Sequence, residues 1–167
     1  MDRRTALVAA ATLIATPSTS GASEVRRLEA GGMTFSWRHL GGRLYGRLRA
    51  PGRGWLAVGF NDQPNLRGTR FVMAAVREGV VRVEERLALV PEHVPISEAG
   101  GRSGLADVAG AFDGHQSEVV FSMPHTTEDT LVVHLAPGSR SHVMLAYATH
   151  PEFDHHSRWR GHFDVTL

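Results

Sequence analysis

From residue 24 onward, apolar and polar residues alternate over short stretches, and turn-forming residues separate these stretches. Met33, Phe35 and Trp37, for example, alternate with polar residues before the turn at Gly41-Gly42. Because successive side chains of a strand point to opposite faces, this spacing predicts a strand with one buried face. No window has apolar residues at convincing helical spacing. The pattern therefore predicts an all-β domain.

The run from Trp55 to Phe60 differs because it is almost continuously apolar. Such a run is typical of a central strand that is buried on both faces. Further strands are expected at residues 43–49, 70–77, 80–87, 118–123, 130–135, 141–149 and 161–167. Residues 91–114 are rich in Gly, Pro, Ser and Asp, and predict a long surface loop with one or two ordered turns. About nine short antiparallel strands indicate a two-layer sandwich.

Length and composition narrow the classes of protein that fit. The 167 residues are 42% apolar and 21% charged, which suits one globular domain. All 18 basic residues besides histidine are arginine and they balance 17 carboxylates, so nucleic-acid binding is not expected. The absence of cysteine excludes disulfides, thiolate chemistry, iron–sulfur clusters and covalently attached haem.

Residues 1–22 have the features of a secretory signal peptide. Two arginines precede a short apolar run, and small residues follow at Ser20-Gly21-Ala22. The paired arginines also permit the twin-arginine export route. We therefore expect an exported, periplasmic or secreted protein whose mature domain is 23–167. No stretch of the chain is apolar enough to predict a membrane span.

Residues 150–162 contain the densest cluster of potential metal ligands, including His150, His155, His156 and His162. Neighbouring His155 and His156 point opposite ways on an extended chain, so at most one faces a buried site. A mononuclear metal site built from histidines and a carboxylate is one interpretation, although no H-E-x-x-H spacing is present. A solvated polar loop is another. Hydrolysis is not expected, because no Gly-x-Ser-x-Gly sequence occurs.

The run Gly54-Trp-Leu-Ala-Val-Gly-Phe-Asn61 resembles the signature strand of the DOMON domain family, and the order of later elements agrees. These are the turn at Arg67-Gly68-Thr69, the strand from Phe71, and a His-rich loop that leads through Arg160-Gly161 into the last strand. The resemblance covers almost the whole mature chain. It implies an immunoglobulin-like β-sandwich that binds b-type haem or a sugar-like ligand.

In the haem-binding branch, which includes the cytochrome domain of cellobiose dehydrogenase, iron is held between a methionine and a histidine. The resemblance implies His156 as that histidine, with His155 as second choice. The methionine position aligns with Leu66, which has no donor atom. Iron is then five-coordinate, or another side chain reaches it, or haem is not bound.

Three other residues come into question as the second donor. Met73 is the nearest thioether, but seven residues of extended chain separate it from Leu66, roughly 20 Å. We therefore expect Met73 to be a core residue beside Phe71 and Ala75. His93 or His155 is chemically a better donor, and the sequence does not select between them.

A haem slot also needs an apolar wall and cations for the propionates. The wall is expected from Trp55, Leu66, Phe71 and Trp159, and the cations from Arg67 or Arg160. The alternative is that the aromatic residues belong to the core and the arginines are solvated.

The leading hypothesis is an exported, non-catalytic b-type haem domain that relays electrons or senses a redox partner protein. The alternative is a haem-free module for a carbohydrate or another small ligand, with Trp37, Tyr147 and Trp159 as stacking surfaces. A third possibility is an accessory subunit whose sheet edge pairs with a partner.

Overall fold

The computed structural model describes residues 23–126, 133 and 135–167, and in these residues every regular element is a β-strand. The predicted signal peptide and most of the predicted strand 130–135 lie outside the described residues. Within them, no helix is long and apolar enough to cross a bilayer.

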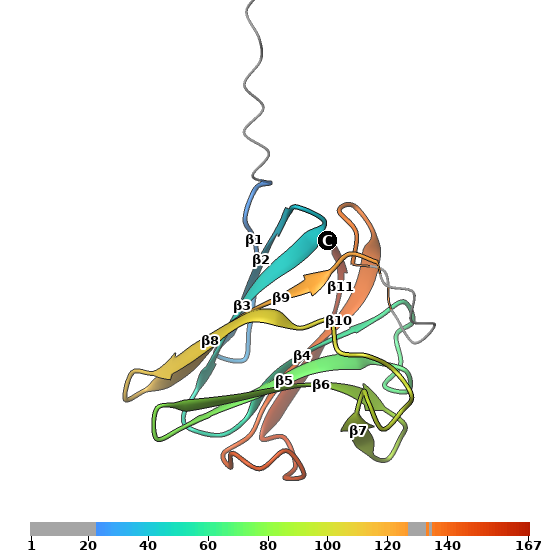
Figure 1. Ribbon diagram of the computed structural model, residues 1–167. Helices are drawn as coiled ribbons and strands as arrows, with labels where there is room; N and C mark the ends of the chain where they lie inside the picture. Colours follow the sequence, from blue (N-terminus) through green and yellow to red (C-terminus); the bar gives the residue numbers. More distant parts are fainter. Residues whose placement is uncertain (1–22, 127–132, 134) are drawn as a thin grey trace, which may run out of the picture.

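The strands form two antiparallel sheets that pack as two layers (Figure 1). The five-stranded sheet has the order β1-β2-β3-β9-β8, formed by β1 (Arg26–Ala30), β2 (Met33–Leu40), β3 (Arg43–Pro51), β9 (Gln116–Pro124) and β8 (Ala106–Phe112). The six-stranded sheet has the order β11-β10-β4-β5-β6-β7, formed by β11 (Trp159–Thr166), β10 (Arg140–Tyr147), β4 (Leu56–Asn61), β5 (Arg70–Arg77), β6 (Val80–Ala88) and β7 (His93–Pro95). This arrangement confirms the predicted all-β, two-layer sandwich.

The main core lies between the sheets and is built by the alternation seen in the sequence. Along β2, Met33, Phe35 and Trp37 are buried while the residues between them are less so. They meet Phe60 of β4 and Phe121 of β9 in one apolar cluster. All six residues of β4 are buried, which confirms the prediction of a central strand covered on both faces.

Two strands lie inside the segment that the sequence predicts as a loop, and that prediction is wrong there. β7 and β8 both fall within 91–114. β8 is an edge strand, mostly exposed, with small residues and a register shift between Ala106 and Ala109. Pairing with β9 holds β8 extended. The strand therefore forms although its own sequence shows little alternation of polar and apolar residues. The edge strand β1 was also not predicted.

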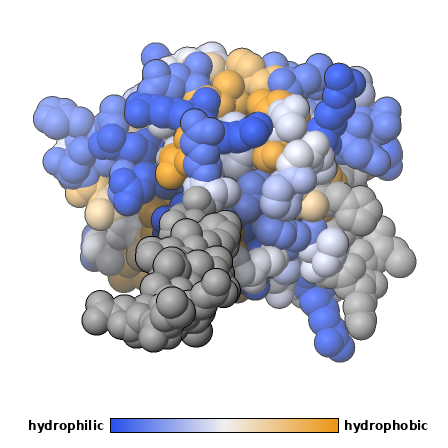
Figure 2. Space-filling view, turned by 90° about the horizontal axis from the view of Figure 1, so that it is seen from above, coloured by the Kyte–Doolittle hydropathy of each residue, from blue (hydrophilic) through white to orange (hydrophobic). Residues whose placement is uncertain are grey.

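Large hydrophobic side chains are exposed only at scattered places among the described residues: Val25, Leu40, Val80, Leu89, Val90 and Val108. Figure 2 shows one face of the molecule, where hydrophilic residues surround smaller hydrophobic areas. The apolar residues are therefore concentrated inside the molecule, in the intersheet core and in a second cluster described next.

Candidate functional site

The outer face of the six-stranded sheet carries a second buried apolar cluster. The outer face of a sandwich sheet is usually solvated. Here Trp55, Phe71, Met73 and Met144 are buried on it, together with Phe153 from the segment between β10 and β11. That segment folds back over the sheet, and its cover explains why β4 is apolar on both sides.

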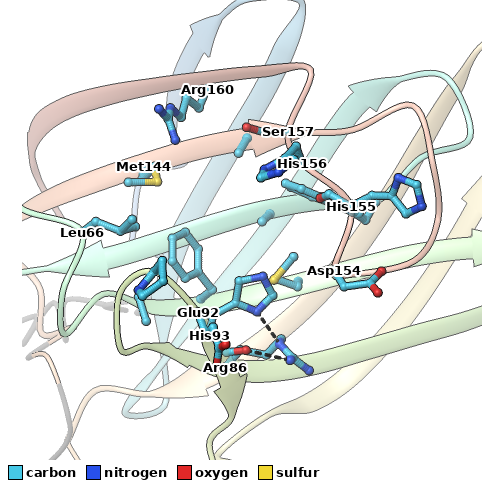
Figure 3. Close-up of a pocket in the computed structure, with 17 residues that line it drawn as sticks. Leu66, Arg86, Glu92, His93, Met144, Asp154, His155, His156, Ser157 and Arg160 are labelled. Carbon is cyan, nitrogen blue, oxygen red and sulfur yellow. Dashed lines mark hydrogen bonds between the residues drawn. The ribbon is translucent and has the colours of Figure 1, made fainter.

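A cavity of about 320 Å³ lies beside this cluster (Figure 3). Its apolar lining comes from Trp55, Ala57, Leu66, Phe71, Met73, Ala88, Pro91, Met144 and Ala146. Its polar lining comes from Arg86, Glu92, His93, Asp154, His155, His156, Ser157 and Arg160. The volume is within the usual range of small-molecule sites.

Small residues make room for this cavity. Ala57 of β4 pairs with Ala146 of β10, and both face the cavity. Next along β4 on the same face, Gly59 has no side chain, and the Phe71 ring takes the vacant space. A Cβ atom at Gly59 would lie 2.5 Å from Cε1 of Phe71, closer than real Cβ contacts allow.

The loop that carries the histidines is anchored to the residue before β4. The backbone N–H of Trp55 donates to the His150 carbonyl (2.9 Å), and its indole N–H donates to the His155 carbonyl (3.0 Å). Gly54 is required at this crossing, because a Cβ there would lie 1.8 Å from the Ala148 carbonyl oxygen. The Gly54-Trp55 pair thus fixes the loop beside the cavity.

His155 and His156 have different surroundings. The His155 ring stacks on His150, with ring centroids 3.9 Å apart, and points away from the cavity in Figure 3. The His156 ring lies on the cavity side. Both residues are exposed to solvent. The alternation expected for neighbouring residues is present, and His156 is the imidazole turned toward the apolar lining.

His93 lines the cavity from the side of β6 and β7. The Nε–H of Arg86 donates to Nδ1 of His93 (2.8 Å), so this ring nitrogen is an acceptor. Because a guanidinium has no lone pair to offer, the neutral ring carries its proton on Nε2. Burial and the positive charge of Arg86 lower the pKa of His93, which favours this neutral form.

Leu66 reaches the cavity because the turn after β4 is tied back on itself. The side-chain amide of Asn61 donates to the carbonyls of Asn65 (2.9 Å) and Arg67 (3.1 Å). This holds the turn over the sheet and leaves Leu66 half-buried against the second cluster. The Arg67 side chain is exposed and does not line the cavity.

Most of the residues predicted for a haem slot therefore meet at one place: Trp55, Leu66, Phe71, His155, His156 and Arg160. Trp159 does not. It lies on the opposite face of β11, where its ring stacks on Tyr147 with centroids 6.2 Å apart. Trp37, considered as a stacking surface for sugars, is buried in the intersheet core.

Several lining residues were missed by the sequence interpretation, and one was only partly described. Met144 and Arg86 were not singled out, although alternation within 141–149 places Met144 on one face with Ala146. Met73 is a buried residue beside Phe71 and Ala75, as expected, but it also lines the cavity. The turn folds back over β5, so Leu66 and Met73 share the cavity despite the extended chain between them.

Solved structures of two cytochrome domains have a similar fold. The cytochrome b domain of pyranose dehydrogenase from Coprinopsis cinerea matches with a TM-score of 0.65 and 13% identity, over 84% of this chain and 80% of that chain. The cytochrome domain of cellobiose dehydrogenase from Myriococcum thermophilum matches with a TM-score of 0.59 and 11% identity, over 86% and 81%. No family model and no curated protein matches the sequence. The chain thus has the β-sandwich fold of these cytochrome domains, and the predicted resemblance is confirmed at the level of fold.

Proposed function

We propose that this protein is an exported module that binds b-type haem without covalent links and takes part in one-electron transfer or redox sensing with a partner protein. The observation that carries the proposal is the covered cavity on the outer sheet face, where His156 faces an apolar lining. The fold shared with cytochrome b domains supports it.

The residues that line the cavity fit a haem group. Haem needs an apolar slot, an axial donor and cations for its carboxylates. Trp55, Phe71 and Leu66 supply apolar walls, and His156 supplies an imidazole. Arg160 lines the cavity and forms no ion pair with another described residue, so its guanidinium is open to a carboxylate.

The chain itself performs three tasks in this proposal. The Gly54-Trp55 crossing holds the histidine loop in place, so that His156 is presented without a large loss of entropy on binding. Phe153 and Leu66 pack on the apolar cluster and cover part of the sheet face. When bound, haem supplies the one-electron chemistry, and the cavity tunes it through ligand identity and burial.

The haem-free carbohydrate module is less well supported by the geometry. Stacking of a sugar ring on an aromatic side chain needs an exposed aromatic face. The aromatic residues at the cavity, Trp55 and Phe71, are buried. Trp159 and Tyr147 face each other on the inner side of the sheet.

The test is titration of the mature protein with hemin, followed by absorption. We expect a Soret band that shifts on reduction, and hemin affinity about tenfold weaker or worse in His156→Ala, which corresponds to about 1.4 kcal/mol. His155→Ala is the matched control, because the ring it removes points away from the cavity. A colourless protein that takes up no hemin would sink the proposal.

A weaker hemin affinity in His155→Ala alone would retain the function but assign the iron to the other histidine. If the wild type and the two variants bind no hemin while all remain folded by circular dichroism, the haem-free module is the better account.

A further inference from the structure

The cavity contains more than one side chain able to hold a metal opposite His156. Its described lining includes two thioethers, Met73 and Met144, and two further histidines, His93 and His155. Haem iron in proteins accepts imidazole and thioether ligands. The positions of these four side chains indicate which of them can act as the ligand opposite His156.

Both further histidines are engaged elsewhere. The His155 ring stacks on His150 and points away from the cavity. Nδ1 of His93 accepts a hydrogen bond from Arg86, and its other ring nitrogen carries the proton. Neither ring therefore presents a free lone pair to the cavity in this arrangement.

The sheet register separates the two thioethers. Met73 pairs with Ala57, and Ala57 pairs with Ala146, so Met73 lies in the row of residues that forms the floor. Met144 lies one row further from the loop of His156, a step of about 7 Å along the strand. Met73 is thus below the open space, while Met144 belongs to the wall opposite the loop.

Figure 3 shows Met144 beside Leu66, across the cavity from His156. Leu66 occupies the position at which the family resemblance implies a methionine ligand. Met144 is 5% exposed and its thioether forms no hydrogen bond with the described residues. A sulfur atom is therefore present at this wall, but it comes from β10 and not from the turn after β4.

Resting on the proposed function, we infer that the Met144 thioether is the second axial ligand, opposite the His156 imidazole. The protein then holds iron through two side chains and has no open coordination position. Such a site favours outer-sphere electron transfer over binding of small molecules, and a thioether ligand raises the reduction potential.

The experiment compares the hemin-loaded wild type with Met144→Leu and Met73→Leu. The three proteins are examined by ferric spin state, by reduction potential and by the rate at which the reduced form binds carbon monoxide. We expect a low-spin ferric wild type. Met144→Leu should lose the low-spin signal, have a lower reduction potential and bind carbon monoxide faster. Met73→Leu removes a thioether from the floor of the same cavity, so its hemin affinity can change, but it should keep the low-spin ferric signal.

A high-spin ferric wild type would overturn the inference while leaving the proposed function intact, and so would loss of the low-spin signal in Met73→Leu only. Absence of hemin uptake by the wild type would instead refute the proposed function. If a variant folds poorly, the ligand can still be identified by a measurement on the wild type. With methyl-¹³C methionine, one methyl signal should shift strongly on hemin binding, and its assignment to Met144 or Met73 decides the question.

Discussion

At Gly59, the missing side chain lets the Phe71 ring lie across β4 and form one wall of the cavity. Gly46 of β3 has the same relation to Phe121 in the intersheet core, where a Cβ would lie 2.5 Å from Cζ of that ring. The two glycines therefore place one aromatic ring each, one beside the proposed haem slot and one remote from it. They form a matched pair for separating stability from binding.

We expect Gly59→Ala and Gly46→Ala each to lower the free energy of unfolding by about 1–3 kcal/mol, because an added Cβ overpacks against a ring. Urea denaturation measures this loss. Only Gly59→Ala should weaken hemin binding, since only there does the displaced ring belong to the cavity. Equal hemin affinities in the two variants would contradict this account of the wall.

At the scale of elements, a buried ion pair fastens the segment between β7 and β8 to the sandwich. Arg70 of β5 and Glu85 of β6 are paired with side chains that are 3% and 0% exposed. Arg70 also donates to the Arg102 carbonyl (3.0 Å), and Glu85 accepts from the Gly104 backbone N–H (2.8 Å). Two neighbouring strands thereby hold a segment that has little apolar surface of its own.

Replacing Glu85 by alanine should destabilise the protein by about 3–5 kcal/mol, because it leaves the Arg70 guanidinium buried without a counter-charge. Chemical denaturation tests this expectation. Glu118→Ala is the comparison, since its ion pair with Arg49 is partly exposed and should be worth about 1 kcal/mol or less. A loss for Glu85→Ala as small as that for Glu118→Ala would show that water reaches the buried pair.

At the scale of the whole molecule, several histidines couple folding to pH. Burial is the main cause that lowers the pKa of His39, His93 and His162. Nδ1 of His39 lies 2.9 Å from Nε2 of His125, and its own Nε2 is buried with no partner among the described residues. Protonation would place an N–H there without an acceptor, so the folded state resists it.

The free energy of unfolding should therefore fall as the pH drops below the ordinary histidine pKa, about 6.5. In that window the unfolded chain binds protons that the folded chain does not, so stability rises with pH. Urea denaturation between pH 5 and 7.5 measures the slope, and His39→Gln should reduce it. An unchanged slope in His39→Gln would mean that the buried ring takes up its proton without penalty.

The sequence alone determined the features that depend on local spacing. Alternation along 33–37 and the apolar run through 55–60 are visible in the chain, because strand side chains alternate wherever a strand forms. The fold class and the central strand followed from them. So did the point that only one of His155 and His156 can face a buried site.

Only the tertiary structure decided which residues meet. β8 is held by its ladder to β9, and nothing in its own small residues marks it as a strand. Met144 and Arg86 join the cavity, while Trp159 falls on the other face of its strand. The physical reason is that a cavity on a sheet face depends on the pairing register and on which loop covers that face, and both are set by contacts between segments far apart in the chain.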